Sequence, residues 1–103
     1  MGGLDKHIIE EIINVIRAHK EPEKIVLYGS RADGGHKAVS DIDIAIFAKN
    51  WDDSDIACVH TALEDKVNTL LKFDLVDFYR IEKQSLKNSI LLKGQVIYES
   101  GKN

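Results

Sequence analysis

The sequence predicts one α/β (α+β) domain spanning residues 1–103, a small mixed β-sheet flanked by helices. The length suits a single domain. Segments with helical spacing of apolar residues alternate with short β-rich runs, and no internal repeat or linker separates them. The expected order is helix, strand, short helix or turn, strand, helix, strand, helix, strand, which is typical of a sheet with helices packed on it.

The first half of the chain should contain one helix and two strands. A helix is expected over residues 4–20, where isoleucines recur at helical spacing, and it should end before Pro22. The run "KIVLY" (24–28) is predicted as a strand, and residues 30–35 as a turn that is at most briefly helical. Residues 41–48, "DIDIAIFA", alternate between two faces and predict a second strand.

The second half should add two helices and two strands. A helix is predicted from a cap at Asp52, Asp53 or Ser54 to about Leu71. The run "KFDLVDFYRI" (72–81) is predicted as a third strand, followed by a helix over about 82–93 that stops at Gly94. Residues 95–100, "QVIYES", are expected to form a last strand or an extended tail.

Composition narrows the function classes. The net charge is −3, so the chain has no general attraction to polynucleotides or anionic membranes, and we expect neither as a partner. A single cysteine excludes an internal disulfide framework, and the longest apolar runs are far too short to span a membrane. We therefore expect a cytoplasmic protein.

Two carboxylates at the start of the second strand are the first chemical signal. Asp41 and Asp43 are two residues apart on a strand, so their side chains point to the same face. Close carboxylates repel one another unless a cation lies between them. Hard carboxylate oxygens suit Mg²⁺ or Mn²⁺, and Mg²⁺ in proteins is commonly shared between carboxylates and substrate phosphates.

A small-residue turn after the first strand is the second signal. Gly29 and Ser30 follow "KIVLY" directly and are followed by Arg31. Backbone N–H groups in such a turn, a hydroxyl and a guanidinium can bind phosphate oxygens. Each signal alone is common, but the turn followed about ten residues later by Asp-x-Asp predicts a site for a nucleoside triphosphate and metal.

The stretch "GSRADGGHKAVSDIDIAI" resembles the signature of polymerase-β-type nucleotidyltransferases, and the short chain resembles the minimal nucleotidyltransferases (MNT) that act as antitoxins of HEPN-domain proteins. The resemblance implies a third carboxylate on a later strand. "FDLVDF" offers Asp74 and Asp77, which cannot share a strand face, and periodicity does not choose between them. The family pattern of an aspartate followed by two apolar residues favours Asp74.

The resemblance implies two Mg²⁺ ions held by Asp41, Asp43 and Asp74, with ATP as the substrate and its phosphates near Gly29 and Ser30. AMP would be transferred to a tyrosine of a HEPN toxin, which would silence that toxin. A partner chain or a second copy of this one should complete the site. Two alternatives stay open: a binding module that neutralises its partner by contact, and a nucleotidyltransferase for small molecules.

Overall fold

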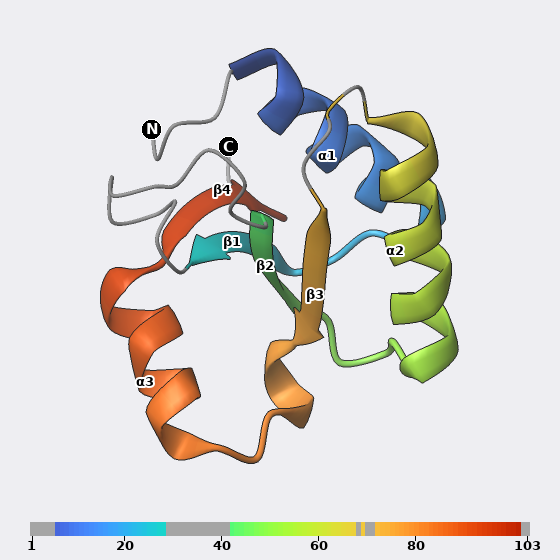
Figure 1. Cartoon of the computed structure of the whole chain (residues 1–103). Helices are drawn as coiled ribbons and strands as arrows, with labels where there is room; N and C mark the ends of the chain where they lie inside the picture. The colour runs from blue at the N-terminus through green and yellow to red at the C-terminus, as the bar shows by residue number, and fades with distance from the viewer. Residues whose placement is uncertain (1–5, 29–41, 68, 70–71, 102–103) are drawn as a thin grey trace.

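The computed structural model describes residues 6–28, 42–67, 69 and 72–101 (Figure 1). Within these residues the chain is a mixed sheet with helices on both faces, as the sequence predicts. The elements follow the order α1 (Lys6–His19), β1 (Lys24–Tyr28), β2 (Ile42–Phe47), α2 (Asp53–Lys66), β3 (Phe73–Asp77), the 3₁₀ helix η2 (Phe78–Arg80), α3 (Gln84–Lys93) and β4 (Gln95–Glu99).

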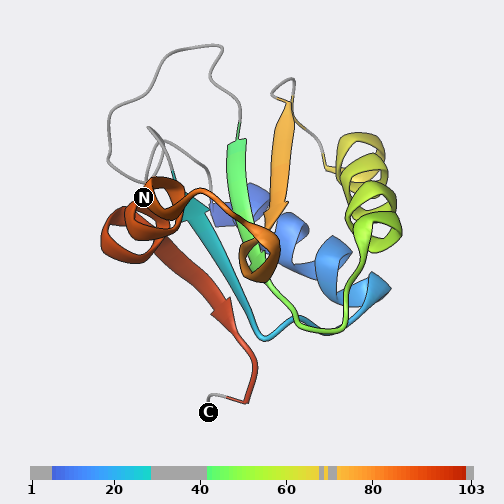
Figure 2. The same ribbon diagram turned by 90° about the horizontal axis from the view of Figure 1, so that it is seen from below.

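The described strands lie in the order β3-β2-β1-β4. β1 is antiparallel to both β2 and β4, whereas β2 and β3 are parallel. Parallel neighbours need a long crossover connection, which here contains α2 (Figure 2). The mixed sheet therefore follows from the one helix inserted between β2 and β3.

The alternation of β2 separates two apolar layers. Ile42, Ile44 and Ile46 belong to the larger core cluster, to which α1 and α2 contribute. Ala45 and Phe47 point to the opposite face and pack with Phe78 of η2 and Ile90 of α3, among others. Asp43 lies on this second face as well, because alternate residues of a strand point to the same side and Asp43 is two residues before Ala45.

Helix α2 begins at the predicted cap but ends earlier than expected. The Asp52 side chain accepts a hydrogen bond from the Asp55 backbone N–H, and the Asp55 side chain accepts one from the Asp52 N–H, which forms a capping box. The helix stops at Lys66, since Val67 adopts an extended conformation (φ −83°, ψ 128°). Leu70 and Leu71, the predicted end of the helix, lie outside the described residues.

Strand β3 is shorter than the predicted run over 72–81. The side chain of Asp77 accepts a hydrogen bond from the Tyr79 backbone N–H (3.1 Å) and so starts η2 in place of further strand pairing. Helix α3 accordingly begins at Gln84, two residues later than expected. The remaining strand bounds match the prediction within a residue, and no described helix is long and apolar enough to cross a bilayer.

An ionic cluster fixes α1 against α2. His19 Nε2 lies 2.8 Å from Asp55 Oδ1, and Lys20 Nζ donates to Asp55 Oδ2 at 3.2 Å. The hydrogen bond to His19, followed by the one from the Asp52 backbone, holds the pKa of Asp55 well below its usual value. The rings of His19 and buried Trp51 also pack in a T-shaped contact (centroids 5.4 Å apart).

Candidate active site

Strand register brings two of the predicted aspartates together. Asp43 of β2 is the direct neighbour of Asp74 of β3 in the parallel ladder. Aligned residues on adjacent strands point to the same face, so the two carboxylates lie side by side on the face covered by η2 and α3. Asp43 is half-buried and Asp74 is exposed, which leaves the pair accessible from solvent.

A tyrosine extends this pair into a row. Tyr28, the last residue of β1, is the antiparallel neighbour of Asp43 and is buried (8% exposed). Burial raises the pKa of Tyr28, and the negative charges of Asp74 and then Asp43 raise it further. We call Tyr28, Asp43 and Asp74 the acidic row. The phenol of Tyr28, at one end of the row, therefore stays neutral, and both carboxylates contribute to its raised pKa.

Asp77, the competing third carboxylate, does not reach the acidic row. Its neighbour in the parallel ladder is Ile46, at the far end of β2. Its side chain caps η2, and the residue is only 7% exposed. Among the described residues nothing hydrogen-bonds to its buried Oδ2, and burial raises its pKa. Asp77 is thus a buried carboxylate at the end of β3 that caps η2.

Four predicted site residues lie outside the described part of the chain: Gly29, Ser30, Arg31 and Asp41. The segment that contains them leaves β1 after Tyr28 and re-enters the sheet at Ile42. Because Tyr28 pairs with Asp43, both ends of this segment are anchored at the acidic row. The segment that carries the predicted phosphate-binding turn and Asp41 therefore starts and ends next to the paired residues Tyr28 and Asp43.

The donor set of the row fits a hard divalent cation. Neighbouring Asp43 and Asp74 offer carboxylate oxygens, the ligands that Mg²⁺ prefers. The described residues contain no cluster of three or more acidic, histidine or cysteine side chains able to hold a metal. The expected third ligand, Asp41, belongs to the segment that is not described, so the described part supplies two members of the predicted set.

Sequence reasoning did not single out Tyr28. One signal was present in the sequence, since Tyr28 directly precedes Gly29 and ends the strand that leads into the predicted site. Its position beside Asp43 depends on the pairing of β1 with β2, which residue spacing alone does not reveal.

Comparison with known proteins agrees with this architecture. The model of the family "Polymerase beta, Nucleotidyltransferase" matches residues 10–103. No curated protein matches the chain. A solved structure of a toxin–antitoxin complex with AMP-PNP is similar, with a TM-score of 0.77 and 24% identity over 90% of this chain and 74% of that chain.

A second solved structure, the tri-AMPylated HEPN toxin of Shewanella oneidensis in complex with its MNT antitoxin, also resembles the chain. The TM-score is 0.73 at 21% identity, over 94% of this chain and 74% of that chain. A mutant MntA–HpeT toxin–antitoxin complex gives a TM-score of 0.75 at 21% identity, over 90% and 74% of the two chains. At these identities the likeness establishes the fold. With the family model matching nearly its whole length, the chain belongs to the polymerase β nucleotidyltransferase family.

Proposed function

We propose that this chain transfers AMP from ATP to a tyrosine hydroxyl of a HEPN-domain toxin and thereby acts as its antitoxin. The observation that carries the proposal is the register of β2 and β3, which sets Asp43 beside Asp74 in a chain whose family is nucleotidyltransferase. Paired carboxylates that solvent can reach are able to hold the divalent ions used in metal-assisted phosphoryl transfer. The proposed setting is the cytoplasm, where ATP is available.

Each residue has a proposed role. Asp43 and Asp74, together with Asp41, would hold Mg²⁺, which when bound would neutralise the triphosphate and orient it for in-line attack. The acceptor oxygen would bond to the α-phosphorus, while pyrophosphate leaves and the hydroxyl proton is released. Gly29, Ser30 and Arg31 would bind the phosphates. The short sequence separation between these groups and the shared anchoring at the acidic row support the assignment.

The acceptor hydroxyl must come from another molecule or another part of the surface. Tyr28, the hydroxyl of the acidic row itself, is 8% exposed and its raised pKa keeps it protonated. Similar structures supply a candidate partner, because one of them is a complex with an AMPylated HEPN toxin. Contact with such a partner would make the transfer effectively intramolecular, which is a large source of rate enhancement.

The test is transfer of label from α-³²P-ATP in the presence of Mg²⁺ to a purified HEPN-domain protein encoded beside this chain. Wild type should label the partner on tyrosine, and Asp43→Asn should not. Asp65→Asn is the matched control, since Asp65 is an exposed carboxylate on α2 away from the row. If the partner is silenced equally by wild type and Asp43→Asn without any label, a non-catalytic binding module explains the function instead.

A further inference from the structure

Helix α3 exposes apolar side chains that its own fold does not use. Ile90 is the buried residue of α3, whereas Leu91 is 59% exposed and Leu92 is 82% exposed. Val96, just after the helix in β4, is 49% exposed. Single exposed apolar residues are ordinary, but three within six residues concentrate exposed apolar side chains around the end of α3 and the start of β4, and gathered apolar surface is a feature of binding sites.

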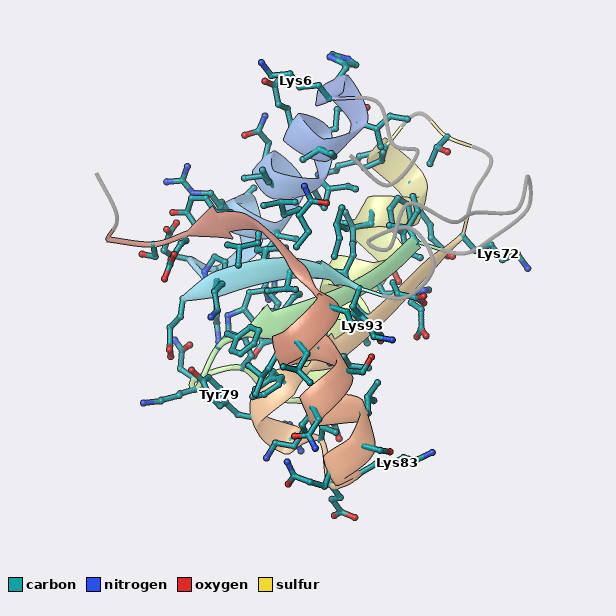
Figure 3. The ribbon with its side chains drawn as sticks, turned by 90° about the vertical axis from the view of Figure 1, so that its left-hand side faces the viewer. Lys6, Lys72, Tyr79, Lys83 and Lys93 are labelled. Carbon is teal, nitrogen blue, oxygen red and sulfur yellow. The ribbon has the colours of Figure 1, made fainter. Side chains whose placement is uncertain are left out.

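The same segment is basic, although the chain as a whole is acidic. Residues 83–98 contain three lysines and no aspartate or glutamate, against a net charge of −3 for the chain. Figure 3 shows Lys83 and Lys93 at opposite ends of α3, with Lys93 at the end nearest the sheet. We call the surface formed by these apolar and basic residues the α3 face; its members are Lys83, Lys87, Leu91, Leu92, Lys93 and Val96.

The α3 face ends beside the acidic row. In the antiparallel pairing of β1 with β4, Leu27 is opposite Gln95. Tyr28, which follows Leu27, and Lys93, which ends α3 two residues before Gln95, therefore lie at the same end of the sheet. Helix α3 also packs on the sheet face that carries Asp43, through Ile90. A molecule seated on the α3 face would be next to the carboxylates.

We propose that the α3 face is the docking surface for the protein acceptor, and that the acceptor presents to it an apolar patch rimmed by acidic residues. This inference rests on the proposed function and adds where the acceptor binds. The leucines would supply the buried contact that dominates affinity. The lysines would accelerate association with an acidic surface. Docking there would place a tyrosine hydroxyl of the acceptor at the acidic row.

The experiment measures binding separately from transfer. A HEPN-domain protein encoded beside the chain is immobilised, and binding is followed by biolayer interferometry in the Asp43→Asn background, so that modification does not alter the partner. Leu92→Asp should raise the dissociation constant at least tenfold. Ala57→Asp, an equal charge change at an exposed position of α2 on the opposite sheet face, should change it less than twofold. Both side chains are exposed, so circular dichroism should show unchanged folding.

A second variant tests the electrostatic part. In the same Asp43→Asn background, Lys83→Glu should slow association severalfold at low salt. This difference in association rate from the Asp43→Asn protein should shrink as added salt screens the charges. Unchanged binding in both Leu92→Asp and Lys83→Glu overturns the docking surface. A wild-type complex that depends on Leu92 but is never labelled would overturn the proposed transfer and leave the surface standing. If Leu92→Asp instead converts a dimer of this chain to monomer with partner binding intact, the α3 face is a self-association surface and the proposal is wrong.

Discussion

Substituting Asp74 by asparagine should stabilise the protein without metal and weaken its response to metal. Asp43 and Asp74 are aligned on adjacent parallel strands. Strands are about 5 Å apart, so two unit charges would repel by about 1 kcal/mol in water and about 3 kcal/mol at an effective dielectric constant near 20. Since Asp74 is exposed, we take about 1 kcal/mol. In a domain of this size that corresponds to a rise of about 4 °C in Tm.

The metal response should change in the opposite direction. A cation between the two carboxylates removes their repulsion and is bound by both, so Mg²⁺ should raise the Tm of wild type by linkage. Asp74→Asn removes one ligand; a loss of about tenfold in affinity would reduce this gain by about 1.4 kcal/mol. Differential scanning fluorimetry across a Mg²⁺ titration measures both effects. Transfer should be abolished in this variant, while binding of a fluorescent ATP analogue is largely kept.

Asp77→Asn is the matched control, because it changes the other aspartate of β3 and leaves the acidic row intact. It should retain the wild-type response to Mg²⁺ and most of the transfer activity. The reasoning is refuted if Asp77→Asn loses the metal response and Asp74→Asn keeps it, since the site would then use the opposite face of β3.

Three further predictions concern stability. Burial raises the pKa of Asp77, so its charge destabilises the fold above that pKa; Asp77→Asn should match or exceed wild type in urea melts at pH 7, and the difference should shrink toward pH 4. The pKa of Asp55 is lowered, so its contribution is fully present above the unfolded value of about 3.9 and is lost as the pH falls through the lower folded pKa; Asp55→Asn should destabilise at pH 7, and the difference from wild type should begin to narrow below pH 4. A Cβ at Gly94 would lie 2.5 Å from Val26 Cγ1 and closer to the Ile90 carbonyl; Gly94→Ala should cost about 1–3 kcal/mol in thermal melts.

Local patterns predicted most of the fold. The alternation in "DIDIAIFA" separated Ile42, Ile44 and Ile46 from Asp43, and the structure places them in the two layers that the spacing implies. The errors lie at element ends, where side chains compete with the backbone ladder. Asp77 ends β3 by capping η2, and no apolar period records that choice. The predicted end of α2 was similarly too late, because apolar residues continue after Lys66, where the helix ends.

The site could be predicted only in part. Spacing placed Asp41 and Asp43 on one face, but the choice between Asp74 and Asp77 needed the family pattern, because both faces of β3 carry apolar residues. The register of β2 with β3 sets Asp74, and not Asp77, beside Asp43. Register depends on packing between segments distant in sequence, which residue spacing does not specify. The roles of Gly29, Ser30, Arg31 and Asp41 stay predictions.

The central claim is that Asp43 supports covalent transfer of AMP to a protein partner. The most direct measurement is the intact mass of a HEPN-domain protein co-expressed with this chain. With wild type, the partner should gain whole AMP units, and peptide mapping should place them on tyrosine. With Asp43→Asn, the partner should co-purify with the chain at its unmodified mass. An unmodified partner in the presence of wild type, with its toxicity nonetheless suppressed, would contradict the account.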